Sequence, residues 1–146
     1  MRRMIGVTVV LLSLGLAARP AEAQSQGSTV QNRAGALLPN YPNPFNPETT
    51  IPFVLDPELF EGGGLVRVSI RILNLMLQPV AIPTALNHPA GNRPGVLNLE
   101  FTTPGRHEAY WDGLDMNGRK VASAPYLVQL EVNGRHRGLM KILVKK

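Results

Sequence analysis

Residues 66–72 read Val-Arg-Val-Ser-Ile-Arg-Ile, and this stretch decides the fold class of the chain. Every second side chain is β-branched and apolar, and the side chains between them are Arg or Ser. An alternation of period two puts one row of side chains into a core and the other into solvent, as in a β-strand with one buried face. An amphipathic helix would repeat its apolar residues every three or four positions instead. We therefore expect a β-strand here.

The same alternation recurs on both sides of this stretch, so the chain is expected to be all-β. A shorter strand is expected around residues 78–82, one helical turn at most at residues 56–60, and a long connection over residues 83–104 with a strand only at its end. Asn133-Gly134 suits a two-residue hairpin turn, in which both residues need positive φ. About seven antiparallel strands of this kind predict an immunoglobulin-like β-sandwich. The other side chains expected to face its core are Ile51, Phe53, Leu55, Leu97, Leu99, Phe101, His107, Ala109, Trp111, Tyr126, Val128, Leu130, Val132, Met140, Ile142 and Val144.

The N-terminal residues have the layout of a secretory signal peptide. Arg2 and Arg3 precede an apolar run over residues 4–18 and an Ala-Glu-Ala cleavage sequence at residues 21–23. The apolar run is shorter than the ~20 residues that span a bilayer, and we expect no transmembrane segment after cleavage. The protein is accordingly expected to be exported, to the cell exterior, the outer surface or the periplasm. The expected organisation is a signal peptide at residues 1–23, a flexible linker at residues 24–36 and one domain at residues 37–146.

The chain has no cysteine, so the domain must be stabilised by its core and not by disulfides. Its net charge is +5, and much of the excess lies near the C-terminus. Such a basic end could bind an anionic surface polysaccharide, whereas the same charges would also protect a strand edge from aggregation. Export makes nucleic acid the least fitting partner, and none is expected. The candidate partner-binding residues of this basic end are Arg135, Arg137, Lys141, Lys145 and Lys146.

Two motifs stand out beside this alternation. The first reads NYPNPFNP and consists of Asn40, Tyr41, Pro42, Asn43, Pro44, Phe45, Asn46 and Pro47. The second consists of Trp111, Asp112, Gly113, Asn117 and Gly118, followed by Tyr126. Prolines fix φ and remove amide donors, so the first motif is stiff before folding. We expect Tyr41 and Phe45 to be aromatic plugs, and Asp112 and Asn117 to form side-chain-to-backbone turns.

Together with residues 66–74 and Val80, these motifs resemble, in the same order, the type A C-terminal sorting domain of type IX secretion cargo. They are also similar to the immunoglobulin-like domain of flagellar hook-capping proteins. The resemblance implies a seven-stranded sandwich that an outer-membrane secretion machine reads, with the cargo often joined to a surface lipopolysaccharide. The chain departs from the family at Leu77, where glycine is usual, and at Ser123-Ala124, where Ser-Gly is usual. A large cargo usually precedes the family domain, whereas only about a dozen linker residues are expected here.

The sequence gives little basis for catalysis. It has no cysteine and no G-x-S-x-G, H-E-x-x-H or P-loop motif. Its histidines, His88, His107 and His136, lie on separate segments, and His107 is expected to be a packed core residue. We therefore expect no enzyme activity and no cofactor. The one weak metal candidate is a calcium site from Asp112, Asp115 and Asn117, which lacks the bidentate Glu of an EF-hand loop.

These observations favour an exported, non-catalytic module for cell-surface anchoring, adhesion or assembly. Its expected partners are the outer-membrane secretion machinery, another exported protein or a second copy of itself. The alternative is a standalone or truncated type IX sorting signal that directs transport across the outer membrane. Carbohydrate binding has less support, because only 5% of the residues are aromatic and the single Trp is expected in the core.

Overall fold

The computed structural model describes residues 35–146, so the predicted signal peptide and residues 24–34 of the predicted linker lie outside the described residues. The described part is all-β, as predicted, apart from one short 3₁₀-helix, η1 (Pro57–Phe60), where one helical turn was expected. Its strands are β1 (Ala36–Leu37), β2 (Thr49–Leu55), β3 (Val66–Leu73), β4 (Pro79–Ala81), β5 (Thr84–Ala85), β6 (Leu99–Phe101), β7 (Gly105–Trp111), β8 (Pro125–Val132) and β9 (Arg135–Leu143).

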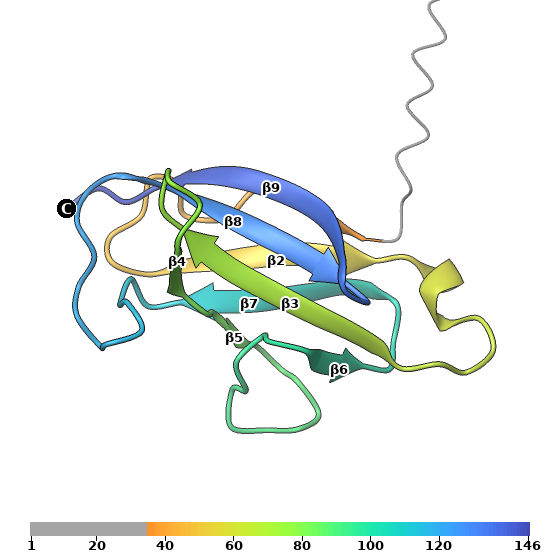
Figure 1. The fold of residues 1–146 in the computed structure, drawn as a ribbon. Coiled ribbons are helices and arrows are strands. Elements are labelled where there is room, and N and C mark those ends of the chain that lie inside the picture. Colours follow the sequence, from red (N-terminus) through yellow and green to blue (C-terminus); the bar gives the residue numbers. More distant parts are fainter. Residues whose placement is uncertain (1–34) are drawn as a thin grey trace, which may run out of the picture.

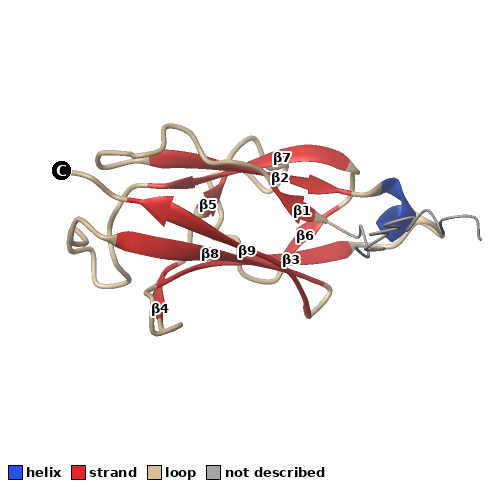
Figure 2. Cartoon of the chain, turned by 90° about the horizontal axis from the view of Figure 1, so that it is seen from above, coloured by secondary structure: helices blue, strands red, loops and turns tan. Residues whose placement is uncertain are grey.

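The strands form two antiparallel sheets that face each other as two layers (Figures 1 and 2). One sheet has the strand order β1-β2-β7-β5. The other has the order β4-β3-β8-β9, and β6 also pairs with β3. We call the first the β2–β7 sheet and the second the β3–β8 sheet.

The core between the sheets is built from the alternating side chains. Val66, Val68, Ile70 and Ile72 of β3 are fully buried, and Arg67 between the first two is exposed. Burying such apolar side chains stabilises the fold by roughly 1.5–3 kcal/mol each. Trp111 and Phe45 are only 2% and 1% exposed, which confirms their expected place in the core.

The connection over residues 83–104 contains more structure than predicted. It opens with β5, which pairs with β7, and it buries Val96 completely. A two-residue strand shows no periodicity, so the sequence pattern could not reveal it. Leu97 was expected to face the core, but it is exposed because Asn98 has φ +50° and breaks the alternation before β6 begins.

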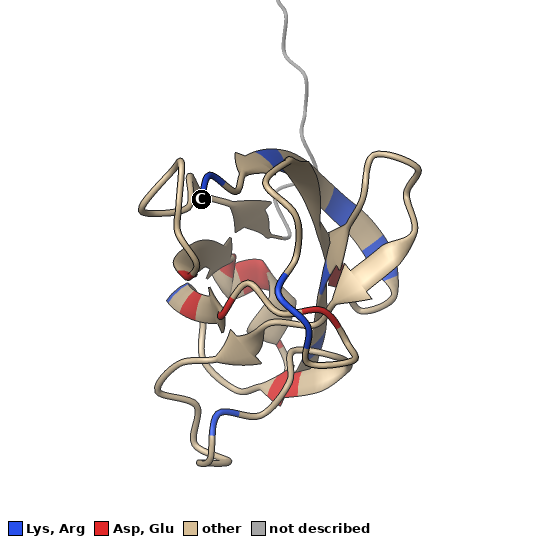
Figure 3. Ribbon diagram, turned by 90° about the vertical axis from the view of Figure 1, so that its left-hand side faces the viewer, with Lys and Arg blue, Asp and Glu red and all other residues tan. Residues whose placement is uncertain are grey.

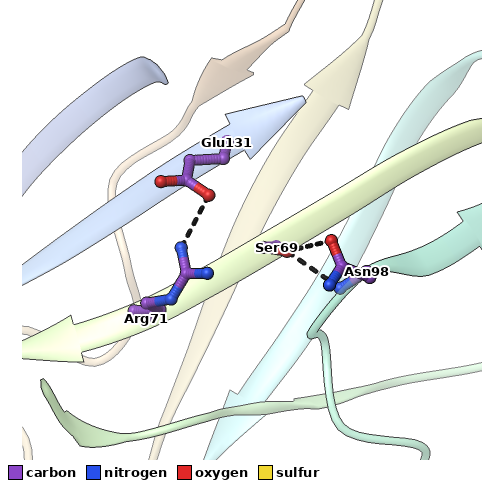
Figure 4. Close-up of polar contacts among 4 residues, drawn as sticks. All are labelled: Ser69, Arg71, Asn98 and Glu131. Carbon is purple, nitrogen blue, oxygen red and sulfur yellow. Dashed lines mark hydrogen bonds and ion pairs between the residues drawn. The ribbon is translucent and has the colours of Figure 1, made fainter. Parts of the chain in front are cut away.

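Polar contacts fasten this connection to the outer face of the β3–β8 sheet (Figure 4). The Asn98 amide donates to the Ser69 Oγ at 2.8 Å, and the Ile70 amide donates to the Val96 carbonyl at 2.8 Å. On the same face the Arg71 guanidinium pairs with the Glu131 carboxylate of β8 at 2.6 Å. Both charged side chains are about a quarter exposed, so this pair is more shielded than an ordinary surface ion pair.

The predicted hairpin turn at Asn133-Gly134 is confirmed. Both residues have positive φ, +50° and +74°, and Val132 pairs directly with Arg135. The turn sends β9 back along β8, so β3 and β9 end at the same end of the sandwich, where β8 begins.

Candidate functional site

The two sequence motifs meet at one end of the sandwich. β2 begins and β7 ends there, because Thr49 pairs with Trp111. β8 begins and β9 ends there too, because Pro125 pairs with Leu143. We call this the motif end and the other the far end; the motif end lies beside the C-terminus in Figure 1.

The NYPNPFNP segment joins the two sheets at the motif end. Tyr41 exchanges two backbone hydrogen bonds of 2.9 Å with Thr50 of β2. Phe45 donates its amide to the Leu143 carbonyl and accepts from the Lys145 amide, both at 3.0 Å, in a parallel bridge. The peptide bonds before Pro42, Pro44 and Pro47 are cis. One short segment therefore bonds to both layers.

Aromatic side chains from the two motifs form one buried cluster. The Phe45 and Trp111 rings meet edge to face at 5.5 Å, and the Trp111 and Tyr126 rings meet at 5.6 Å. Such pairs add about 0.5–1.5 kcal/mol each to the stabilisation from burial. The polar atoms are satisfied, since the Trp111 Nε1 donates to the Leu114 carbonyl and the Tyr126 hydroxyl donates to the Ala122 carbonyl.

The motifs also touch through their backbones. Gly113 has φ +75°, and a Cβ added there would lie 2.2 Å from the Pro47 carbonyl oxygen. Only glycine fits at position 113, both for its φ and for this close approach to Pro47. Within the first motif, Asn40 is buried, and its Nδ2 donates to the Pro42 carbonyl at 3.2 Å and to the Thr49 Oγ1 at 3.0 Å.

Tyr41 is not the aromatic plug that was expected. It is 47% exposed, and its hydroxyl donates to the Glu108 Oε1 at 2.6 Å. The backbone pairing with Thr50 explains this difference, because it directs the Tyr41 side chain to the outer face of the β2–β7 sheet. Arg106 also bonds to the same Glu108 oxygen at 3.2 Å.

Two tyrosine–glutamate pairs lie on this outer face. The hydrogen bond from Tyr41 lowers the pKa of Glu108, and the neighbouring Arg106 lowers it further. The same hydrogen bond, with the Glu108 charge, raises the pKa of Tyr41. Tyr110 bonds to Glu48 in the same way, which raises the pKa of Tyr110. Arg93 covers the Tyr110 ring at 5.2 Å from its centroid.

The acidic side chains of the second motif stabilise turns. The Asp112 Oδ1 accepts from the Leu114 amide at 3.0 Å, as predicted. The turn role expected of Asn117 belongs to Asp115, whose Oδ1 accepts from the amides of Asn117 and Arg119 at 2.8 and 2.9 Å. Residues 35–146 contain no cluster of three or more His, Cys, Asp or Glu side chains that could hold a metal ion. Calcium binding by Asp112, Asp115 and Asn117 stays a prediction.

Two of the three histidines pack around one ring. The rings of His88 and His107 lie 4.9 and 4.8 Å from the ring of Phe101. His107 was expected in the core, but it is only half-buried at the edge of this cluster, and its Nε2 bonds to the Thr103 carbonyl at 2.8 Å. His136 lies apart from them, on β9.

The five basic residues of the C-terminal region do not form one patch. Arg135 and Arg137 begin β9 at the far end, whereas Lys145 and Lys146 follow β9 at the motif end. At ~3.3 Å per residue these groups are roughly 30 Å apart. The Lys146 amide donates to the Ser123 Oγ at 3.1 Å, so the backbone of the last residues is held in place. Figure 3 faces this end and shows basic segments at the C-terminus and in a neighbouring loop, together with acidic ones.

The sequence patterns did not identify the most exposed apolar segment. Leu75, Met76 and Leu77 form the tip between β3 and β4 and are 60%, 75% and 60% exposed. Leu77 has φ +62°, a conformation that costs a side chain such as Leu about 1 kcal/mol or more. The sequence did contain a sign of this tip, because three consecutive large apolar residues stand where turn residues such as Gly, Asn or Asp are usual.

Within the described range, the chain has no helix long and apolar enough to cross a membrane. Comparison with protein-family models and with curated proteins finds no match for this chain.

Proposed function

We propose that this chain is an exported, non-catalytic β-sandwich module of the immunoglobulin-like type that serves anchoring, adhesion or assembly at the cell surface. The strand order supports the fold type. Immunoglobulin domains pair strands A-B-E-D in one sheet and C-F-G in the other. Assigning β1, β2, β7 and β5 to the first set and β3, β8 and β9 to the second reproduces that order, with β4 as an additional edge strand beside β3.

Tyr126 gives the fold type further support. Immunoglobulin-like domains carry a tyrosine near the start of strand F whose hydroxyl bonds back to the backbone a few residues upstream. Tyr126 is the second residue of β8, the strand equivalent to F, and it bonds to the Ala122 carbonyl at 3.1 Å.

The observation that carries the functional proposal is the interlocking of both motifs at one end of the molecule. Gly113 lies against Pro47, Phe45 against Trp111, and the residues after β9 against Phe45. Partners bind such a preorganised surface at a lower entropic cost than a flexible one. The resemblance to sorting and hook-capping domains rests on the same residues. We therefore propose that the motif end presents a rigid surface to another exported protein, to the secretion machinery or to a second copy.

Cell fractionation with mass spectrometry tests this proposal. We expect the protein outside the cytoplasm, with Gln24 as its first residue. A cytoplasmic protein that keeps Met1 would contradict export. A surface role also predicts that protease added to intact cells degrades the protein, and protection from that protease would contradict it.

The alternative proposal is a sorting signal. The hydrogen-bonded backbone of residues 144–146 supports it, because a segment held in one arrangement is bound at a lower entropic cost than a flexible one. Residues 37–146 fused behind an exported reporter, in a host with a type IX machine, provide the test. A reporter that crosses the outer membrane with the native fusion but not with its Gly113→Val variant supports sorting. Periplasmic retention of both fusions contradicts it and leaves the surface module as the proposal.

A further inference from the structure

The apolar tip Leu75–Leu77 has no role in the core of this domain. Its three side chains are the most exposed consecutive large apolar residues among residues 35–146. Leu77 keeps a leucine side chain at φ +62°, where glycine would fit without strain. An exposed leucine in this conformation brings the folded domain no stabilisation. A surface that covers the tip would give these side chains an apolar contact that the domain itself does not supply.

Four of the five backbone amides of residues 74–78 are hydrogen-bonded within the turn, and the Leu75 amide is the exception. The Asn74 Oδ1 accepts from the amides of Met76 and Gln78 at 2.9 and 3.0 Å. The amide of Leu77 donates to the Asn74 carbonyl, and that of Asn74 donates to the Gln78 carbonyl, both at 3.0 Å. Unpaired amides are costly to transfer out of water. These four amides would stay paired if the tip left water.

Basic residues lie at the same end of the molecule as the tip. The tip follows the end of β3, and Lys145 and Lys146 follow the end of β9, which is also at the motif end. Arg119 and Lys120 lie in the loop that packs beside β4, where the Met116 amide donates to the Val80 carbonyl. These four basic side chains are exposed and take part in none of the ion pairs of residues 35–146.

The positions of the acidic residues only partly add to the charge difference between the two ends of the molecule. Asp56, Glu58 and Glu61 surround η1 at the far end, away from the tip. Asp112 and Asp115 share the motif end with the basic residues, but each turns its Oδ1 onto backbone amides of its own loop. Glu48 also precedes β2 at the motif end, and Arg135 and Arg137 begin β9 at the far end. The attraction of an anionic surface to the motif end therefore depends on the four exposed basic side chains beside the tip.

We propose that the tip Leu75–Leu77 inserts into an anionic lipid surface, with Arg119, Lys120, Lys145 and Lys146 attracting the headgroups. A lipid surface fits better than a protein partner, because a convex tip of three side chains is small beside the ~800 Å² that each partner buries in a standard protein interface. A lipid interface needs only inserted apolar area and electrostatic attraction. The inference does not depend on the route of secretion.

The absence of cysteine makes a site-specific test direct. Met76→Cys, labelled with an environment-sensitive fluorophore, reports on the tip. Leu65→Cys is the matched control, because Leu65 is 55% exposed and lies at the other end of β3. Both proteins are prepared in the same way, so they share one N-terminus. We expect a blue shift at position 76 with phosphatidylglycerol-containing vesicles, and none at position 65 or with pure phosphatidylcholine.

Partition into the same vesicles tests the residues themselves. Leu75→Ser combined with Met76→Ser should weaken binding by about tenfold or more, because the inserted apolar area is lost. Lys145→Glu with Lys146→Glu should also weaken it about tenfold, and added salt should remove this difference. Equal blue shifts at both labelled sites, or equal binding to neutral vesicles, would overturn the proposal. So would dimerisation by light scattering that the double serine variant abolishes, since the tip would then be a contact between copies.

Discussion

The two ends of the sandwich are closed by aromatic clusters of different construction. The motif end is closed by Phe45, Trp111 and Tyr126. The far end is closed by Phe53, Phe101, His88 and His107. At the motif end the polar atoms of Trp111 and Tyr126 donate to carbonyls of the loop between β7 and β8, so that cluster also fixes a loop.

The glycines show the same contrast. An added Cβ at Gly62, Gly63 or Gly64, in the far-end loop, would meet no atom within 4 Å. At Gly113 it would meet the Pro47 carbonyl at 2.2 Å. The glycines of the far-end loop thus serve a local turn, whereas Gly113 is required by a contact between distant segments.

Truncating the two clusters should reveal the difference most strongly. Trp111→Ala is expected to lower the free energy of unfolding by about 4–5 kcal/mol, the upper part of the range for aromatic truncations, because it also leaves the Leu114 carbonyl without its donor. Phe101→Ala loses ring contacts but no hydrogen bond, and it should cost about 3 kcal/mol. Urea denaturation measures both, and equal losses would contradict the comparison.

A glycine pair separates contact from backbone strain. Gly113 and Gly63 have the same φ, +75°, but only Gly113 has a close neighbour. Gly63→Ala should cost about 1 kcal/mol from its φ alone, and Gly113→Ala at least about 2 kcal/mol more because the Pro47 backbone must move. Thermal unfolding of both variants checks this. Similar losses would mean that Pro47 moves freely and that the motifs do not interlock.

Removing one hydroxyl should give a smaller effect. Tyr126→Phe keeps the ring packing but leaves the Ala122 carbonyl without its donor, which should cost about 1 kcal/mol. Tyr110→Phe is the comparison: its hydroxyl bonds to Glu48, which is exposed, so water can replace the lost bond and the loss should be smaller than for Tyr126→Phe. If urea unfolding shows no loss for Tyr126→Phe, this hydroxyl does not stabilise the loop.

The smallest expected effect is on pH dependence. The pKa of Tyr41 is raised in the folded state, so its contribution to stability is complete below the ordinary tyrosine value of 10.0 and is lost as pH rises through the raised value. The pKa of Glu108 is lowered, so its contribution holds above the ordinary value of 4.5 and is lost as pH falls through the lowered one. In an absorbance titration of the tyrosinates, Tyr41→Phe should remove a late-titrating group. An unchanged curve would contradict the Tyr41–Glu108 bond.

Much of the fold could be predicted from the sequence because one face of each long strand is buried. The inward residues of β3 and β8 follow that alternation closely. β5 could not be predicted, because a strand of two residues shows no periodic pattern. The exposure of Leu97 could not be predicted either, because it follows from a single positive φ at Asn98. The burial of Phe45 and Trp111 was predictable from ring size, whereas the position of Tyr41 depends on a backbone bridge to Thr50. The tip was missed because an apolar turn contributes nothing to the core.

The bridge between Phe45 and Val144 also bears on the timing of folding. The two residues lie close to opposite ends of the described chain, so their pairing joins segments that are almost the whole domain apart in sequence. A nascent chain still attached to the ribosome before residue 144 has emerged lacks the strand on which Phe45 docks. Contacts of such long range form slowly. The motif end is therefore completed only after translation of the residues that follow β9.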